Sequence, residues 1–202
     1  MKEKDLFAHK SKGWDANSKR VQGAKAIANA IVERIELKDN MHIMDFGAGT
    51  GLLSYCLSDR VGKVTAIDNS PSMLEVFAEK SSLFNCPTEV MELDLSREVP
   101  TDMIFDGIVS SMTIHHLQDI EDMLSKMYSM LPDGGFIALA DLDSEDGTFH
   151  SDNIGVFHYG FNRDTLKEIA KKIGFREISF ETVSIIKKPQ CDFSVFLMTA
   201  YK

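Results

Sequence analysis

The 202-residue sequence predicts an α/β fold, in which helices cover both faces of an open, mostly parallel sheet. Three observations lead to this prediction. Short apolar runs alternate with stretches of helical periodicity, a glycine cluster follows the first run, and the last two β-rich runs are separated by a short connection. Alternation with helices requires parallel pairing through crossovers, whereas a short connection favours antiparallel pairing. We therefore expect a doubly wound, seven-stranded sheet that ends in a hairpin.

The first half of the chain alternates helical and strand patterns after a polar start. Apolar residues recur at helical spacing from Val21 to Ile35. A later helix begins at Pro71, because proline is favoured at the first position of a helix. The predicted elements of this half are helices at 21–35, at 52–60 and from 71, and strands at 42–46, 63–68 and 88–93.

The second half continues this alternation and then changes character. Pro132 stops a helix that runs through Met127, and Gly174 caps the next helix. The connection at 187–190 is too short for a crossover helix, so the last two strands should pair antiparallel. The predicted elements are strands at 105–110, 135–140, 175–186 and 193–200, and helices at 120–131 and 164–173.

Composition and charge exclude several classes of protein. Hydrophobic residues make up 44% and charged residues 26%, which is typical of a globular chain with a substantial core. With 22 Lys and Arg against 31 Asp and Glu, the net charge is −9, so we expect neither nucleic-acid nor membrane binding. We interpret residues 1–202 as a single domain, in which 1–38 form an N-terminal helix and lid region and 39–202 form the core and the hairpin.

The cysteines and the opening segment point to a reducing compartment. Cys56, Cys86 and Cys191 are odd in number and widely spaced, which is unlike a disulfide scaffold. The opening residues contain no apolar leader core, and no run approaches the roughly 18 apolar residues of a spanning helix. We therefore expect a cytoplasmic protein.

The strongest functional signal is the loop Asp-Phe-Gly-Ala-Gly-Thr-Gly at 45–51, directly after the first strand. Glycines allow the backbone to turn tightly and to approach a ligand at the carboxyl end of a strand. Asp68 ends the second strand about 20 residues after Gly47, where an acid accepts both hydroxyls of a ribose. The loop and the acid together predict an adenosine-type ligand.

Two adenosine ligands compete for this loop, a nicotinamide dinucleotide and S-adenosylmethionine. The dinucleotide fingerprint GxGxxG would need a third glycine where Leu52 stands. Asp45, beside the loop, would repel a pyrophosphate but attract an ammonium and a sulfonium. The residues therefore favour S-adenosylmethionine, and an NAD(P)-dependent oxidoreductase is the less favoured alternative.

At these residues the chain resembles the class I, Rossmann-like S-adenosylmethionine-dependent methyltransferases, and most closely the small bacterial enzymes of quinone-biosynthesis and other small-molecule type. The resemblance implies the strand order 3-2-1-4-5-7-6 with strand 7 antiparallel. It also implies transfer of a methyl group to a small-molecule acceptor, with S-adenosylhomocysteine as product. The motifs that carry it are Met44-Asp-Phe-Gly-Ala-Gly-Thr-Gly51, Ala66-Ile-Asp-Asn-Ser-Pro-Ser-Met73, Leu93-Asp94-Leu95, Phe105-Asp-Gly-Ile-Val-Ser-Ser111 and Leu131-Pro-Asp-Gly-Gly135.

The resemblance further implies a set of cofactor contacts. Those at the methionine end are Asp45, Gly47, Ala48, Gly49, Gly51 and Ser110. Those around the adenosine are Asp68 at the ribose, Asn69 and Met73 beside the nucleoside, Asp94 at the adenine amino group, and Leu95 through its backbone. Structural alternatives stay open: the glycines could serve only a turn, Asp68 could cap a helix, and Met73 could belong only to an apolar helix face.

Methyl transfer from a sulfonium mainly requires alignment and exclusion of water, and a base only where the acceptor must lose a proton. Side chains on loops after the fourth and fifth strands are weak catalytic candidates, with a purely structural or solvated role as the alternative. We expect no metal, because these side chains lack the helical spacing of a typical ligand pair. The candidates are His115, His116, Asp141, His150 and His158.

The N-terminal segment contains Trp14, the only tryptophan, followed by Asp15 and the pair Lys19-Arg20. In similar enzymes such a segment covers the cofactor as a lid, and a cation on it could meet the methionine carboxylate. A frayed terminus anchored by Trp14 is the alternative. A protein that binds S-adenosylmethionine without catalysis is the second functional class, and it predicts cofactor affinity without turnover.

Overall fold

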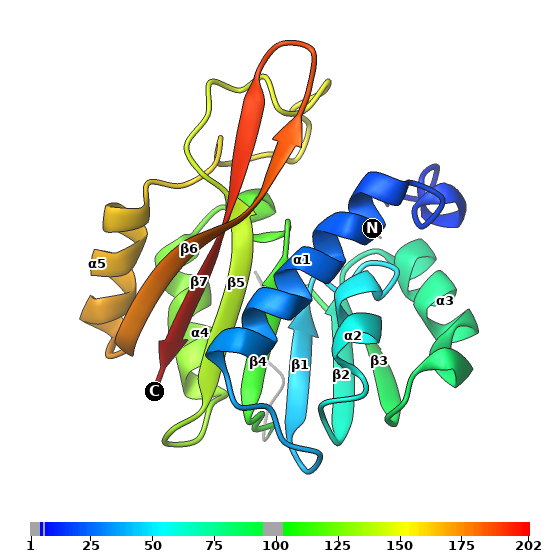
Figure 1. Ribbon diagram of the computed structural model, residues 1–202, viewed down its shortest axis with the longest axis vertical. Helices are drawn as coiled ribbons and strands as arrows, with labels where there is room; N and C mark the ends of the chain where they lie inside the picture. Colours follow the sequence, from blue (N-terminus) through cyan, green and yellow to red (C-terminus); the bar gives the residue numbers. More distant parts are fainter. Residues whose placement is uncertain (1–4, 6, 95–102) are drawn as a thin grey trace. The chain divides into compact units, whose positions relative to one another are not determined.

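The computed structural model describes residue 5, residues 7–94 and residues 103–202. The strands of this part of the chain are β1 (His42–Phe46), β2 (Lys63–Asp68), β3 (Thr88–Glu92), β4 (Gly107–Ser111), β5 (Phe136–Leu142), β6 (Arg176–Lys187) and β7 (Asp192–Tyr201). They form one sheet in the order β3-β2-β1-β4-β5-β7-β6, in which β7 is antiparallel to both neighbours (Figure 1). The predicted fold class and strand order are confirmed.

Within this fold the chain divides into two compact units, Met1–Asp94 and Leu95–Lys202. In the first unit, β1 pairs in parallel with β2, and β2 pairs in parallel with β3. These pairings bring the carboxyl ends of three strands to one edge, which is where ligands bind in open α/β sheets. The helices of this unit are η1 (Ser11–Gly13), α1 (Ser18–Arg34), α2 (Leu52–Leu57), α3 (Pro71–Glu79) and η2 (Ser81–Leu83).

Local sequence explains where these helices begin and end. The Asn17 side chain accepts hydrogen bonds from the first N–H groups of α1, and Ser70 caps α3 directly before Pro71. The helix α2 is shorter than the predicted 52–60. The Ser58 hydroxyl donates to the Tyr55 carbonyl at 2.9 Å, and this side-chain bond takes a carbonyl at the end of the helix.

The second unit is built on β5, whose seven residues are all buried. It pairs in parallel with β4 and antiparallel with β7, and the long hairpin of β6 and β7 confirms the predicted antiparallel end. The β4 strand begins at Gly107 rather than at the predicted 105, because the Phe105 N–H donates to the Met130 carbonyl outside the sheet. A Cβ at Gly107 would lie 2.1 Å from the Phe136 ring, so the strand needs glycine there.

The helices of the second unit follow strands as the sequence predicts, and they are η3 (Ile114–His116), α4 (Ile120–Ser129) and α5 (Arg163–Ile173). A long loop joins β5 to α5, and it carries the acidic and histidine-rich segment singled out in the sequence. Among the residues that the structure describes, none of the helices combines the length and the apolar character that a bilayer crossing requires. All three cysteines are free, and Cys191 is exposed.

Candidate functional site

The glycine loop after β1 has a backbone that ordinary side chains rarely adopt. Gly47, Gly49 and Gly51 have φ angles of 65°, 55° and 83°. A Cβ on Gly51 would lie 2.5 Å from the Phe77 ring, whereas a Cβ on Gly49 would meet nothing within 4 Å. Gly51 therefore allows the helix α3 to pack closely against the loop, while Gly49 leaves open space above it.

Asp68, at the end of β2, fastens this loop to the start of α3. Its Oδ2 accepts the Gly49 N–H at 2.8 Å, and its Oδ1 accepts the Ser70 N–H at 2.8 Å. Burial raises the pKa of this carboxyl, while the two backbone donors oppose that shift. Each carboxylate oxygen retains a further lone pair, so the group can also accept hydrogen bonds from a ligand.

Asp45 is the second carboxylate of the site and is almost completely buried in β1, with 1% of its surface exposed. The Ser54 hydroxyl on α2 donates to its Oδ2 at 2.5 Å. Burial, reinforced by the charge of Asp68, raises the pKa of Asp45 to about 7 despite the hydrogen bond from Ser54. The group is therefore poised to ionise when a cation comes near.

The N-terminal segment contacts the glycine loop and both ends of the helix α3. The Thr50 hydroxyl donates to Asp15 Oδ1 at 2.6 Å, and Asp15 Oδ2 pairs with Lys80 after α3. The Ser70 hydroxyl donates to Asp5 Oδ1 at 2.8 Å. These polar contacts attach the segment to the loop and to the cap of α3. The proposed lid thus has defined contacts in the first unit, although its movement stays a prediction.

Two aromatic contacts further define this segment. The Arg20 guanidinium lies 3.8 Å from the centre of the Trp14 ring, and Phe7 meets the same ring edge to face at 6.0 Å. Arg20 is thus engaged with Trp14 in this structure. The sequence predicts that a cation of this segment meets the methionine carboxylate of the cofactor, and that role stays a prediction.

The structure places the remaining predicted cofactor residues unevenly. Asn69 is exposed next to Asp68, whereas Met73 is 3% exposed on the inner face of α3. The Leu93 N–H donates to the Asp68 carbonyl at 3.0 Å, which brings the segment that leads to Asp94 beside the end of β2. Ala48 is buried in the loop, Ser110 is buried in β4 of the second unit, and Leu95 lies outside the described residues.

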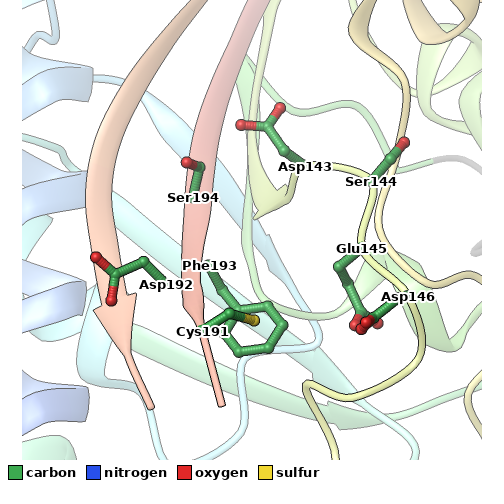
Figure 2. Close-up of a pocket in the computed structure, with 8 residues that line it drawn as sticks. All are labelled: Asp143, Ser144, Glu145, Asp146, Cys191, Asp192, Phe193 and Ser194. Carbon is green, nitrogen blue, oxygen red and sulfur yellow. The ribbon is translucent and has the colours of Figure 1, made fainter. Parts of the chain in front are cut away.

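In the second unit, the segment after β5 and the start of β7 enclose an acidic pocket of about 240 Å³ (Figure 2). A neighbouring pocket of about 300 Å³ lies around the start of α5. Asp143 lines both pockets, and Arg163 of the second pocket binds it through two nitrogen–oxygen contacts of 2.6 Å. The residues that line the acidic pocket are Asp143, Ser144, Glu145, Asp146, Cys191, Asp192, Phe193 and Ser194.

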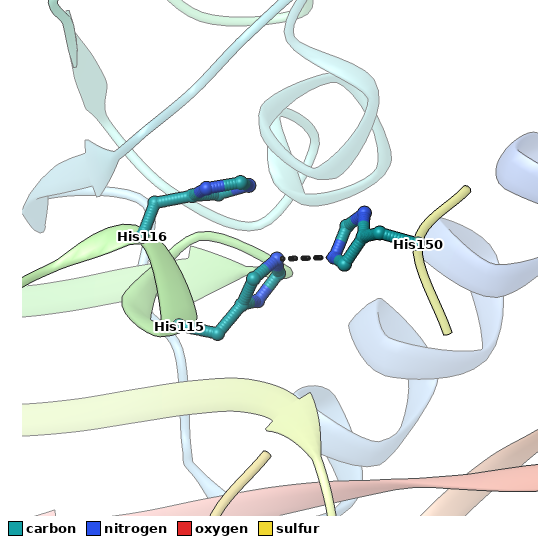
Figure 3. A group of neighbouring side chains, drawn as sticks. All are labelled: His115, His116 and His150. Carbon is teal, nitrogen blue, oxygen red and sulfur yellow. Dashed lines mark hydrogen bonds between the residues drawn. The ribbon is translucent and has the colours of Figure 1, made fainter. Parts of the chain in front are cut away.

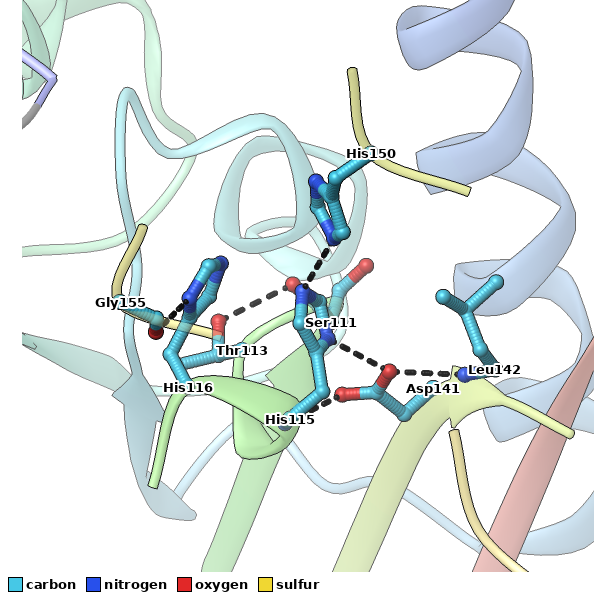
Figure 4. A network of polar contacts seen from close by, with 8 residues as sticks. All are labelled: Ser111, Thr113, His115, His116, Asp141, Leu142, His150 and Gly155. Carbon is cyan, nitrogen blue, oxygen red and sulfur yellow. Dashed lines mark hydrogen bonds and ion pairs between the residues drawn. The ribbon is translucent and has the colours of Figure 1, made fainter. Parts of the chain in front are cut away.

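Three histidines and one buried aspartate converge near the end of β5 (Figures 3 and 4). Asp141 is fully buried, and its Oδ1 lies 2.7 Å from His115 Nδ1. The Nε2 atoms of His115 and His150 are 3.1 Å apart. His116 lies beside them, with its Nδ1 2.7 Å from the Gly155 carbonyl oxygen. Four of the five predicted catalytic candidates therefore come together.

These contacts fix the proton positions on two of the rings. A carboxylate and a carbonyl are acceptors, so Nδ1 of His115 and of His116 carries a proton, and in the neutral form of each ring Nε2 carries the lone pair. Burial, followed by the charges of His115 and His116, lowers the pKa of His150 to about 4. The cluster therefore presents imidazole lone pairs, which can accept a proton or bind a metal ion.

His158, the fifth candidate, has a different environment. Its backbone N–H donates to the His115 carbonyl at 3.2 Å, and its ring lies 5.1 Å from the ring of Phe161. Its Nε2 is buried and has no hydrogen-bond partner among the residues that the structure describes. His158 therefore packs against Phe161, which agrees with the purely structural role that the sequence analysis gave as the alternative to catalysis.

Sequence reasoning did not identify several side chains that support these sites. Ser54 and Thr50 were not assigned a role, although Ser54 follows the last glycine of the loop by less than one helical turn. Ser70 was included only within the motif at 66–73, directly before the predicted helix start at Pro71. Arg163 gave no sequence signal, because its partner Asp143 is 20 residues away along a loop. Such contacts depend on the loop path rather than on spacing.

Comparison with known proteins agrees with this architecture. A family model described as a methyltransferase domain matches residues 43–135. An uncharacterised methyltransferase of Schizosaccharomyces pombe is 31% identical over 77% of this chain and 58% of its own length. A malonyl-[acyl-carrier protein] O-methyltransferase of Acetivibrio thermocellus is 28% identical over 66% of this chain and 47% of its own length. The chain thus spans about half the length of these relatives.

Two solved structures have the same fold. A SAM-dependent methyltransferase from Aquifex aeolicus superimposes with a TM-score of 0.68 and 22% identity, covering 95% of this chain and 97% of that one. Phosphoethanolamine N-methyltransferase 2 of Haemonchus contortus, solved with S-adenosyl-L-methionine, superimposes with a TM-score of 0.69 and 18% identity. The match covers 98% of this chain and 59% of that one. Residues 43–135 therefore match the methyltransferase-domain family model, and the chain has the class I, Rossmann-like fold of these solved S-adenosylmethionine-dependent methyltransferases.

Proposed function

We propose that this chain is an S-adenosylmethionine-dependent methyltransferase that acts on a small-molecule acceptor. The observation that carries the proposal is the position of Asp68. Its two oxygens bind the Gly49 N–H and the Ser70 N–H, so one carboxylate joins the glycine loop to the cap of α3. A ribose at this carboxylate would lie directly beside an open glycine backbone, as the sequence predicts.

The residues of the first unit fit the cofactor in charge and in space. A side chain at Gly49 would enter open space, so the loop offers the close backbone approach that the ligand needs. Asp45 supplies a buried negative charge for an ammonium or a sulfonium, and Asp68 supplies acceptors for ribose hydroxyls. Neither carboxylate would favour the pyrophosphate of a dinucleotide.

The chemistry follows from this assignment. When bound, S-adenosylmethionine would supply an activated methyl group: a lone pair of the acceptor would bond to the methyl carbon in line as the carbon–sulfur bond breaks, and the thioether S-adenosylhomocysteine would leave. The residues of this chain hold the reactants and exclude water, which is most of what such a displacement requires. An acceptor that must lose a proton also needs a base.

Four observations support a small-molecule acceptor. The two pockets of the second unit, of about 240 and 300 Å³, lie at or below the lower end of the volumes of small-molecule sites, so they would admit only a small acceptor or part of one. Carboxylates line both pockets, so they favour an acceptor that carries amine or hydroxyl donors. The net charge of −9 disfavours a nucleic-acid acceptor. One similar protein is named for the methylation of phosphoethanolamine, which is a small amine.

The proposal is tested by calorimetric titration of the full chain with S-adenosylmethionine, S-adenosylhomocysteine and NAD. We expect saturable binding of the two sulfur ligands and none of NAD. The variant Asp68→Ala should weaken that binding at least about 100-fold, because the ribose acceptors are lost. Glu92→Ala is the matched control: Glu92 pairs with Asp68 across the sheet but is exposed, so the variant should bind as wild type does.

The outcomes separate the alternatives. Binding of NAD alone would overturn the methyltransferase assignment in favour of an oxidoreductase. Tight binding of S-adenosylmethionine with no S-adenosylhomocysteine release across a panel of small amines, phenols and carboxylic acids would favour the non-catalytic binding protein. Unchanged affinity in Asp68→Ala would refute the position of the ribose.

A further inference from the structure

The histidine cluster of the second unit is not explained by cofactor binding. It consists of His115 in η3, His116 beside it, and His150 on the loop between β5 and α5. One ring nitrogen from each lies within 4.8 Å of the other two. Three imidazoles rarely gather in this way for packing alone, because each is polar and must satisfy its nitrogens.

We propose that His115, His116 and His150 form a binding site for a divalent transition-metal ion, with Zn²⁺ as the best match. The three histidines belong to the second unit and the glycine loop belongs to the first, and the proposal does not depend on methyltransferase activity. It also differs from our sequence-based expectation that no metal is bound, which rested on the absence of helical ligand spacing. The loop, rather than a helix, supplies the third ligand.

The spacing of the nitrogen atoms suits this ion. Two imidazole nitrogens that bind one tetrahedral Zn²⁺ at 2.0–2.1 Å lie about 3.3 Å apart. The Nε2 atoms of His115 and His150 are 3.1 Å apart, and their rings point toward each other (Figure 3). His116 completes a triangle with sides no longer than 4.8 Å. A side-chain movement of about 1.5 Å at most would bring all three nitrogens into range.

The outer contacts are those that orient metal-binding histidines. The buried Asp141 carboxylate holds His115 Nδ1, and the Gly155 carbonyl holds His116 Nδ1 (Figure 4). Both rings therefore direct an Nε2 lone pair away from these partners, as in carboxylate–histidine–metal and carbonyl–histidine–metal arrangements. Asp141 is held in turn by the backbone N–H groups of His115 and Leu142.

The donor set determines the class of ion. Three neutral imidazoles suit Zn²⁺, Co²⁺, Ni²⁺ or Cu²⁺, whereas Mg²⁺ and Ca²⁺ require oxygen ligands. Asp141 is occupied by His115 and by backbone donors, so we assign it a supporting role and not a place among the ligands. Three protein ligands leave a tetrahedral ion one further position, which a water molecule would fill.

The short distance between the Nε2 atoms of His115 and His150 also has an interpretation without a metal ion. One of the two facing Nε2 atoms can carry a proton, and His150 would then donate a hydrogen bond to His115. In that case the three rings form a polar packing cluster with no affinity for an ion. The two interpretations differ in a property that can be measured directly.

The test is a titration of the chelator-stripped full chain with Zn²⁺, followed by calorimetry, and with Co²⁺, followed by its visible absorption. We expect one equivalent to bind, with the intense absorption of tetrahedral nitrogen coordination. His150→Ala and His116→Ala should each weaken binding at least about 10-fold. Both side chains are only partly buried, so these variants should fold, and circular dichroism checks that they do.

Two control variants address other metal-binding groups. His9→Ala removes an exposed histidine of the first unit, and Cys191→Ser removes the exposed thiol. Neither should change the affinity or the Co²⁺ spectrum. Absence of saturable binding, or equal affinity in the wild type and both histidine variants, would refute the proposal. Loss of binding in Cys191→Ser would also refute it, because the ligand would then be sulfur.

S-adenosylmethionine binding, measured in the same samples, separates this proposal from the proposed function. His150→Ala should bind the metal more weakly, whereas Asp68→Ala should bind it as the wild type does. A chain that binds the sulfur ligands but no metal would refute only the metal site. A chain that binds the metal but no sulfur ligand would refute only the methyltransferase assignment.

Discussion

The glycine loop of the first unit and the histidine cluster of the second unit are built in opposite ways. The loop is a short continuous segment whose backbone conformation makes the site, with Asp45 and Asp68 supplying charge. In the cluster, side chains from η3, β5 and a long loop must converge, and backbone groups only orient them. The first kind of site is encoded locally, whereas the second depends on how a loop is placed. The predictions below test this difference.

The largest effect should come from a methyl group added to the loop. Gly51→Ala places a Cβ 2.5 Å from the Phe77 ring at a φ of 83°, so both overpacking and backbone strain oppose folding. We expect the free energy of unfolding to fall by about 3 kcal/mol. Urea denaturation of the two proteins measures this difference.

Gly49→Ala is the matched comparison for this variant. Its φ of 55° is also strained, but the added Cβ meets nothing within 4 Å. We expect a loss of only about 1 kcal/mol in stability, with a larger loss in S-adenosylmethionine affinity because the methyl group enters the ligand space. Equal destabilisation by both variants would contradict the assignment of Gly51 to packing and Gly49 to ligand approach.

The cluster is tested by replacing its buried carboxylate. Asp141→Asn leaves one acceptor oxygen and turns an amide N–H₂ toward donors that the carboxylate satisfied, at His115 and Leu142. We expect a loss of about 2 kcal/mol in the free energy of unfolding and a His115 ring without a fixed tautomer. Nitrogen chemical shifts of the histidine rings report the tautomer. An unchanged tautomer would show that Asp141 does not orient the ring.

The two sites also differ in how far the sequence predicted them. The strand order and the positions of the loop and Asp68 followed from motifs that are continuous or lie at fixed spacing, and the structure places these residues together. The catalytic candidates were named one by one, but their convergence was not foreseen. His150 reaches His115 through a loop of irregular path, and no periodicity describes such a path.

Element boundaries show the same limit on a smaller scale. The strands β1 and β2 match the predicted residues because hydrophobic patterning defines them. The end of α2 and the start of β4 were wrong by two or three residues, since side-chain and backbone bonds of Ser58 and Phe105 decide them. Such single contacts leave no periodic trace in the sequence.

Proton binding at Asp45 makes the free energy of unfolding depend on pH, and this effect is smaller than those of the substitutions above. The pKa of Asp45 is about 7 in the folded chain, well above its ordinary value near 4, so the unfolded chain releases this proton first as the pH rises. Asp45 therefore costs stability progressively between about pH 4 and pH 7. Asp45→Asn, which cannot ionise, should remove this slope and should be the more stable protein above pH 7.

The same titration should control cofactor affinity in the opposite direction. A cationic ligand favours the ionised carboxylate, so S-adenosylmethionine affinity should fall by up to about tenfold per pH unit below pH 7. Calorimetry at several pH values measures this dependence. Asp45→Asn should bind more weakly, with an affinity that is flat over the same range. A wild-type affinity that is independent of pH would show that Asp45 does not face the cationic end.

The smallest effect concerns the N-terminal segment, which connects to the loop through exposed and half-buried polar contacts. Asp15→Ala removes the acceptor of the Thr50 hydroxyl and the partner of Lys80. Because partly exposed pairs contribute little, we expect a loss of only about 0.5 kcal/mol in global stability. Trp14 is the only tryptophan and adjoins Asp15, so its fluorescence reports this segment alone.

The ligand dependence of that fluorescence distinguishes a lid from a static terminus. A lid predicts that S-adenosylmethionine changes the Trp14 emission in the wild type, and that Asp15→Ala alters the emission before any ligand is added. The control Asp59→Ala, at an exposed position after α2, should leave both signals unchanged. Identical emission with and without saturating ligand would show that the segment keeps one conformation. In that case, the polar contacts of Asp15 serve only to anchor the chain beside the glycine loop.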